Sequence, residues 1–184
     1  MLTVSDIVAL LGGRGCRAYG GEPVSQREHA LQAAYRAESA GAPDWLVIAA
    51  LLHDLGHLLR DPGGAAPGGD HRHEQLGARL VAPLLGRPIA RVIALHVKAK
   101  RYLCATVPGY CETLAPASLR SLTLQGGPLG PAEVATFERQ PYQREAVQLR
   151  RWDDAAKIAG ALAPGLDHYR PRLEEARRRA SAVD

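Results

Sequence analysis

The chain has 184 residues and a hydrophobic fraction of 46%, which excludes a disordered protein and suits a single domain over residues 1–184. Its longest apolar run, residues 45–52, is far shorter than the roughly 20 residues that span a bilayer, and the N-terminal stretch lacks a basic leader, so we expect a cytoplasmic protein with no membrane partner. The formal charge of +4 owes much to arginines between residues 170 and 179, but no aromatic residues are interleaved with them, which argues against binding to nucleic acid.

Helical spacing of apolar residues dominates the chain, and no stretch alternates apolar and polar residues, so we predict an all-α fold. The first predicted helix covers residues 26–40, because Ser25 and Glu28 have the spacing of a capping box. This helix places His29 in its first turns. Asp44 is the expected N-cap of a second, strongly apolar helix.

The second predicted helix carries the dipeptide His53-Asp54 near its end, and we expect the helix to continue through it without a break. Residues 63–69 are rich in Gly, Ala and Pro and are predicted to form a loop. Asp70 is then expected to cap a helix that contains His73.

Prolines mark the start of the next two predicted helices. Pro88 lies in the first turn of a helix on which His96 and Lys100 are one turn apart. Pro116 opens a helix with three polar residues along one face. These residues are Ser118, Ser121 and Gln125.

Two further helices complete the predicted bundle. The first covers residues 142–158 and has Arg150 and Asp153 on one face. The second covers residues 167–180. The sequence therefore predicts a bundle of helices, several of which carry one histidine or aspartate that could bind a metal ion.

Six potential metal ligands occur in a fixed order along the chain. They are His29, His53, Asp54, His73, His96 and Asp153. Imidazole and carboxylate ligands without thiolates suit iron, manganese or similar divalent ions. This pattern resembles the HD-domain superfamily in its two-metal form, a helical bundle. The resemblance implies that the first three ligands and Asp153 hold one ion, that His73 and His96 hold the other, and that Asp54 bridges them.

Some residues of similar chemistry are left open or set aside. Asp154 is an alternative last ligand; we prefer Asp153, because it shares a helix face with Arg150, whereas Asp154 can pair outward with Lys157. His71, which is close to His73 in sequence, is a lesser alternative to it as a ligand. The three cysteines form no CxxC pair and no even disulfide framework, so we expect them to be structural. They are Cys16, Cys104 and Cys111.

The residues around the ligands resemble the phosphonate-cleaving di-iron oxygenases, in particular 2-amino-1-hydroxyethylphosphonate dioxygenase. The resemblance rests on Tyr19-Gly-Gly-Glu22 before the first histidine helix, and on the stretches SLTLQGGP and LRRWDDAAK. It implies that Tyr19 guards or ligates an iron until substrate arrives and that Glu22 receives the substrate ammonium group. The implied phosphonate-binding residues are His57, Lys100, Ser118, Ser121, Gln125 and Arg150.

The same resemblance implies a mixed-valence Fe(II)/Fe(III) pair with O2 as co-substrate. The expected reaction breaks the carbon–phosphorus bond of 2-amino-1-hydroxyethylphosphonate to give glycine and phosphate. A quaternary ammonium relative or a shorter hydroxyphosphonate stays open as substrate. Two other functions also stay open: a metal-dependent phosphohydrolase acting on a small phosphate ester or nucleotide, and a non-catalytic module that senses a phosphorylated ligand. The oligomeric state is left undetermined.

Overall fold

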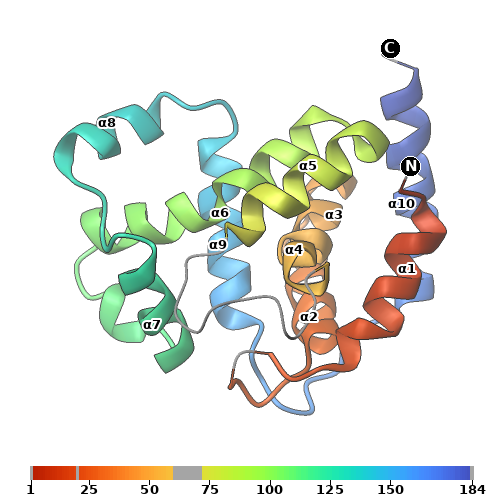
Figure 1. The fold of residues 1–184 in the computed structure, drawn as a ribbon, viewed down its shortest axis with the longest axis horizontal. Coiled ribbons are helices and arrows are strands. Elements are labelled where there is room, and N and C mark those ends of the chain that lie inside the picture. The colour runs from red at the N-terminus through yellow and green to blue at the C-terminus, as the bar shows by residue number, and fades with distance from the viewer. Residues whose placement is uncertain (1, 20, 60–71, 183–184) are drawn as a thin grey trace.

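The computed structural model describes residues 2–19, 21–59 and 72–182, and these residues contain helices but no β-strand, so the all-α prediction is confirmed. Figure 1 shows the arrangement of the helices. They are α1 (Val4–Gly12), α2 (Gln26–Ser39), α3 (Asp44–Leu52), α4 (Leu55–Leu58), α5 (His73–Leu85), α6 (Arg87–Thr106), α7 (Pro116–Leu124), α8 (Pro131–Glu138), α9 (Gln143–Ala155) and α10 (Leu166–Ser181), with two short 3-10 helices, η1 (Arg14–Cys16) and η2 (Cys111–Thr113). The predicted loop at residues 63–69 lies outside the described residues, as do Asp70 and His71.

Helix α3 forms the centre of the hydrophobic core. Every residue from Leu46 to Leu52 is buried, as expected of a helix that is apolar on all sides. Helices α2, α6, α9 and α10 all pack against it, and Figure 1 shows α3 inside the bundle. The C-terminal end of α3 therefore delivers the next residues of the chain directly into the interior.

The helix that carries the His53-Asp54 dipeptide is interrupted, so the prediction of an unbroken helix is wrong. Helix α3 ends at Leu52, and α4 begins only at Leu55. Between them Asp54 has φ −101° and ψ 10°, in the bridge region where active-site residues often lie. The break turns Asp54 away from the axis of α3 and toward α5.

A glycine allows α4 and α5 to approach closely at this point. A Cβ atom placed on Gly56 would lie 2.0 Å from the carbonyl oxygen of His73, a separation that no side chain tolerates. Because glycine has no Cβ, the backbone of α4 can pack against the first turn of α5. This contact brings His57 and Asp54 next to His73.

Three predicted helix boundaries need correction. Asp44 is the first residue of α3 rather than its N-cap, which is Pro43; its carboxylate instead pairs with Arg172 of α10 at 2.9 Å. The N-cap of α5 is Arg72, not Asp70. Helix α9 ends at residue 155, three residues before the predicted position.

Two helices were not expected from the sequence. Helix α1 begins at a capping box formed by Thr3 and Asp6, and it packs beside α10 at one edge of the molecule (Figure 1). Helix α8 has Pro131 in its first turn and packs against α6 through the buried Phe137. None of the described helices is both long and apolar enough to cross a membrane.

Candidate metal centre

The six predicted metal ligands meet in the interior of the bundle. Helix α2 supplies the first, the break between α3 and α4 the next two, and helices α5, α6 and α9 one each. All six are buried: His29, His53, Asp54, His73, His96 and Asp153. Ligands from five segments that are distant in sequence are therefore assembled by tertiary packing around one point.

Three of these side chains form a first cluster. The Nε2 atoms of His29 and His53 lie 3.1 Å apart. Asp153 Oδ1 lies 3.3 Å from His29 Nε2 and 3.8 Å from His53 Nε2. These three atoms are close enough to one another to hold a single metal ion.

A second cluster lies around His73. The Nε2 atoms of His73 and His96 are 3.2 Å apart, and Asp54 Oδ1 lies 3.2 Å from the first and 3.6 Å from the second. The ring of His57 stacks on that of His73, and its Nε2 lies 3.9 Å from Asp54 Oδ1. His57, Asp54 and His73 could hold an ion together, so His57 belongs to this cluster by position.

Asp54 connects the two clusters. Its Oδ1 faces the second cluster, while its Oδ2 lies 3.6 Å from His53 Nε2 and 3.7 Å from His29 Nε2 in the first. A carboxylate with one oxygen directed at each cluster has the arrangement required of a bridging ligand.

Backbone carbonyls orient three of the histidine rings. The Nδ1 atoms of His29, His53 and His96 lie 2.8–2.9 Å from the carbonyl oxygens of Ala156, Ala50 and Ile93, respectively. A carbonyl only accepts hydrogen bonds, so each Nδ1 carries the proton and each Nε2 directs a lone pair into the centre. This is the tautomer that a metal ion requires from a histidine ligand.

The protonation states also suit metal ions. Burial lowers the pKa of His53 and, far more strongly, that of His96, so both rings are neutral. Burial alone would raise the pKa of Asp54, but His53 and His73 hold it well below its usual range. In Asp153 burial is likewise outweighed, chiefly by the charge of Arg150.

One ligand atom also lacks a hydrogen-bond partner. Asp153 Oδ1 is buried and accepts no hydrogen bond, which is costly for a carboxylate oxygen unless a cation satisfies it. Together with the neutral imidazoles of His53 and His96 and the ionised carboxylates, the forms in which these groups bind metals, this oxygen shows that the donor set fits a metal centre.

Tyr19 closes one side of the centre. Its hydroxyl donates a hydrogen bond to Asp54 Oδ2 at 2.7 Å, and its ring stacks on His29 with 4.1 Å between the ring centroids. Burial and the nearby carboxylates raise the pKa of Tyr19 well above its usual value, so the phenol stays protonated. The Tyr19 turn also contains Glu22, whose backbone N–H donates to Tyr19 O and whose buried Oε1 has no hydrogen-bond partner.

Positive charge and hydroxyl groups gather beside the clusters, between α6, α7 and the end of α9. Lys100 is buried and donates to Ser121 Oγ at 2.7 Å. Lys157 donates to Ser118 Oγ at 2.9 Å and lies 3.7 Å from Asp153 Oδ1. Two ammonium groups and two hydroxyls thus converge next to Asp153, an arrangement that suits an anion.

Arg150 is buried and positions Asp153. Its Nη1 donates to Asp153 Oδ2 at 2.6 Å, and its Nη2 to Asp154 Oδ1. Asp154 is also bound by the hydroxyl of Tyr110. Asp153 Oδ1 therefore faces His29 and His53 of the first cluster, while Asp154 faces Arg150 and Tyr110. The expected pairing of Asp154 with Lys157 does not occur, because Lys157 lies against Asp153 instead.

Two residues of this region, Lys157 and Tyr110, are not among the site residues predicted from the sequence. Lys157 follows Asp153 by four residues, so the helical spacing of the two was a signal that could have revealed it. Tyr110 lies just before η2, and no spacing connects it with Arg150. Gln125, which was predicted to bind substrate, is the C-cap residue of α7, and its buried Oε1 has no hydrogen-bond partner.

Known proteins are similar to this chain over most of its length. The HD domain family matches residues 27–154. A hydroxymethylphosphonate dioxygenase of Gimesia maris is 43% identical over 174 residues, which cover 93% of this chain and 86% of the relative. A glycine-betaine-forming [1-hydroxy-2-(trimethylamino)ethyl]phosphonate dioxygenase of Leisingera caerulea is 40% identical over 179 residues, which cover 94% of this chain and 91% of the relative.

The chain therefore belongs to the HD-domain family and, within it, to the phosphonate dioxygenases. The predictions of an HD-domain fold and of an oxygenase enzyme are confirmed.

Proposed function

We propose that this oxygenase cleaves the carbon–phosphorus bond of 2-amino-1-hydroxyethylphosphonate, giving glycine and phosphate. The atoms of this substrate and of one O2 molecule equal those of glycine and phosphoric acid, so the reaction needs no other reductant. The buried, unpartnered carboxylate oxygen of Glu22 carries the choice of an amino substrate. The phosphonate dioxygenase relatives support the class of reaction.

The metal centre is proposed to hold two iron ions. The ligands of one would be His29, His53, Asp54 and Asp153, and those of the other His73, His96 and Asp54. When bound, the iron pair would supply the redox chemistry with oxygen and an electropositive anchor for the substrate's oxygen atoms. Asp54 would bridge the ions, as its two oxygens directed at the two clusters support.

The phosphonate would bind beside the centre, between α6, α7 and the end of α9. Lys100 and Lys157 supply positive charge, and the hydroxyls of Ser118 and Ser121 supply hydrogen bonds, as a phosphonate dianion requires. Arg150 adds charge and holds Asp153 in position. His57 and Gln125, the other two residues predicted to bind the phosphonate, would complete this set of phosphonate-binding residues.

Tyr19 would protect the centre until substrate arrives. Its phenol keeps its proton and occupies Asp54 Oδ2, so the substrate has to displace Tyr19 or accommodate its hydroxyl. Glu22 lies in the turn that begins at Tyr19. A carboxylate at that position would pair with a substrate ammonium group while the phosphonate binds the lysines, which fixes the carbon chain between two charges.

A panel of substrates tests this choice. Iron-loaded, partly reduced protein is incubated in air with 2-amino-1-hydroxyethylphosphonate, its trimethylammonium analogue and hydroxymethylphosphonate, and phosphate release is measured. We expect the highest kcat/KM with the amino compound. The relative with 43% identity favours hydroxymethylphosphonate as the second candidate, and a higher kcat/KM with that compound would replace our choice.

A further inference from the structure

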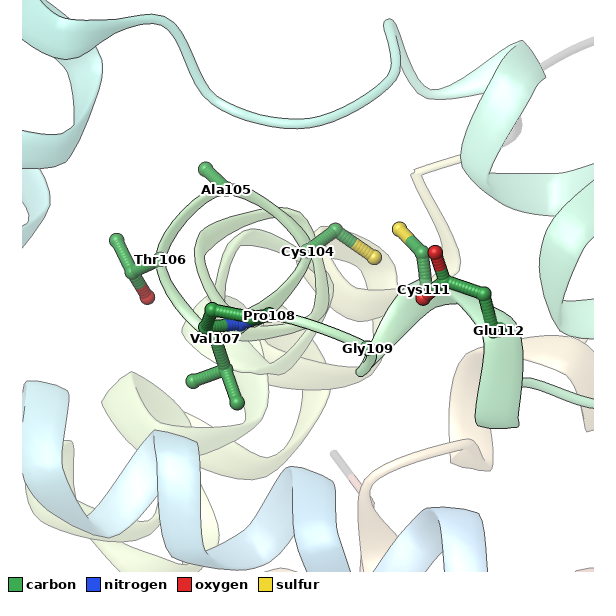
Figure 2. A pocket seen from close by; sticks show the side chains of 8 residues that line it. All are labelled: Cys104, Ala105, Thr106, Val107, Pro108, Gly109, Cys111 and Glu112. Carbon is green, nitrogen blue, oxygen red and sulfur yellow. The ribbon is translucent and has the colours of Figure 1, made fainter.

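Two cysteines outside the metal centre approach each other at the end of α6. Cys104 lies in the last turn of α6, and Cys111 is the first residue of η2. Figure 2 shows both sulfur atoms directed into the gap between these two elements. Burial and a hydrogen bond to Cys111 raise the pKa of Cys104 to about 12. Both thiols are free and partly exposed, so both sulfur atoms are available for reaction with a small molecule from solvent.

A cavity of about 290 Å³ opens beside the two thiols. Besides the cysteines it is lined by the chain that joins them and by Glu112 (Figure 2). This joining segment turns at Gly109, which has φ 78°. A small oxidant such as hydrogen peroxide therefore has a path to both sulfur atoms without passing through the metal centre.

The pair is connected to the proposed phosphonate site from both of its ends. Lys100 lies one helical turn before Cys104 on α6. Tyr110 directly precedes Cys111; its hydroxyl donates to Asp154 and accepts a hydrogen bond from Arg150 Nε at 3.3 Å. Movement at Cys111 would therefore reach Arg150 through a single residue.

We propose that Cys104 and Cys111 form a peroxide-sensitive pair, which closes to a disulfide and thereby weakens phosphonate binding. The Cys111 sulfur attacks after giving up its proton. It bonds to one peroxide oxygen, the O–O bond breaks, and Cys111 becomes a sulfenic acid as hydroxide leaves. The Cys104 sulfur then bonds to the Cys111 sulfur, the S–O bond breaks, and water leaves. Two thiols and one peroxide thus give one disulfide and two water molecules.

Closure draws the start of η2 toward the end of α6. Tyr110 moves with Cys111 and loses its hydrogen bonds to Arg150 and Asp154. Arg150 then no longer holds Asp153 in position, and its own charge is no longer fixed beside the proposed phosphonate site. The effect on binding rests on the proposed function, whereas formation of the disulfide does not.

The chemical step is tested on metal-loaded wild-type protein treated with hydrogen peroxide, alkylated and digested with trypsin. Both cysteines fall in one tryptic peptide, residues 102–120, so closure leaves this peptide unalkylated and lighter by two hydrogen atoms. Cys16→Ser is the matched control, because Cys16 lies on η1, apart from the pair, and this variant should close like the wild type. Two alkylatable thiols after treatment, or oxidation to sulfinic acid without closure, would overturn the proposal.

The regulatory step is read from KM for the phosphonate before and after oxidation. We expect KM to rise about tenfold, as when one charge-assisted hydrogen bond to substrate is weakened, and to recover with dithiothreitol. Cys104→Ser and Cys111→Ser should show no recoverable change, and any peroxide damage to the metal centre would affect all variants equally. A disulfide that leaves KM unchanged would refute the regulatory role. If reduced protein has no phosphonate activity, the proposed function fails, while the peptide masses still decide whether the pair closes.

Discussion

Asp54 Oδ1 lies 3.2 Å from His73 Nε2, and the opposite oxygen of the same carboxylate faces His53. This arrangement depends on the break between α3 and α4, because in an unbroken helix the side chain of Asp54 would not point toward α5. A single side chain therefore contributes to both clusters, and its loss should affect both.

Asp54→Asn should abolish binding of both metal ions. The asparagine keeps the size of the side chain but removes the charge that two cations share, so we expect less than about one iron per chain against about two in the wild type. The iron content of reconstituted protein is measured by atomic spectrometry, with circular dichroism to confirm folding. Asp153→Asn is the matched control and should retain the ion at His73 and His96. Retention of one full ion by Asp54→Asn would show that Asp54 does not bridge.

Gly56→Ala should destabilise the protein and disturb the second cluster. The new Cβ would lie 2.0 Å from the backbone oxygen of His73, which cannot move aside without shifting α5, so we expect a loss of about 1–3 kcal/mol or more. Urea unfolding of metal-loaded protein measures the change. Gly165→Ala is the control, since Gly165 has φ −72° and no atom would lie within 4 Å of its Cβ. Equal unfolding midpoints for the two variants would contradict the close contact of α4 with α5.

The activity should fall above pH 8 because of Lys100. Burial, followed by the charge of Arg150, lowers the pKa of Lys100 to about 8. Below this pH the ammonium is charged and can pair with a phosphonate; above it the amine is neutral, so kcat/KM should decline as the pH rises through 8. Lys100→Arg should move the decline to higher pH, because a guanidinium stays protonated. The same alkaline limb in both proteins would assign it to another group.

Glu22→Gln should selectively impair an amino substrate. The change keeps the volume but removes the charge that would pair with the ammonium group, so we expect a loss of about 1.5–3 kcal/mol, or roughly 10-fold to 150-fold in kcat/KM. Hydroxymethylphosphonate, which has no ammonium group, serves as the internal control and should lose far less. Steady-state kinetics that show equal losses on both compounds would remove Glu22 as the amine receptor.

The six candidate ligands could be predicted from the sequence, because histidines and aspartates occur in a characteristic order on successive predicted helices. The preference for Asp153 over Asp154 also came from local spacing, since Arg150 lies three residues earlier on the same helix face, and the structure places Asp153 Oδ2 2.6 Å from its Nη1. Local periodicity is sufficient for such choices, because the partners lie within one or two helical turns.

The features of the fold and of the site that were not predicted from the sequence depend on tertiary packing. The apolar sequence around His53 predicts one continuous helix, whereas the chain breaks after Leu52 and then packs against α5 at Gly56. Tyr110 reaches Arg150 across 40 residues of sequence, a contact that no periodic pattern encodes. The spacing of Cys104 and Cys111 in the sequence likewise does not show that η2 returns to the end of α6.

The most direct test of the proposed function is the ratio of oxygen consumed to phosphate released. Iron-loaded wild-type protein is supplied with 2-amino-1-hydroxyethylphosphonate in a sealed oxygen-electrode cell, and phosphate and glycine are assayed in the same samples. The account predicts that oxygen, phosphate and glycine change in equal amounts, and that strictly anaerobic samples release no phosphate. Phosphate release without oxygen would contradict the account, because the carbon–phosphorus bond would then be cleaved without oxygen as co-substrate.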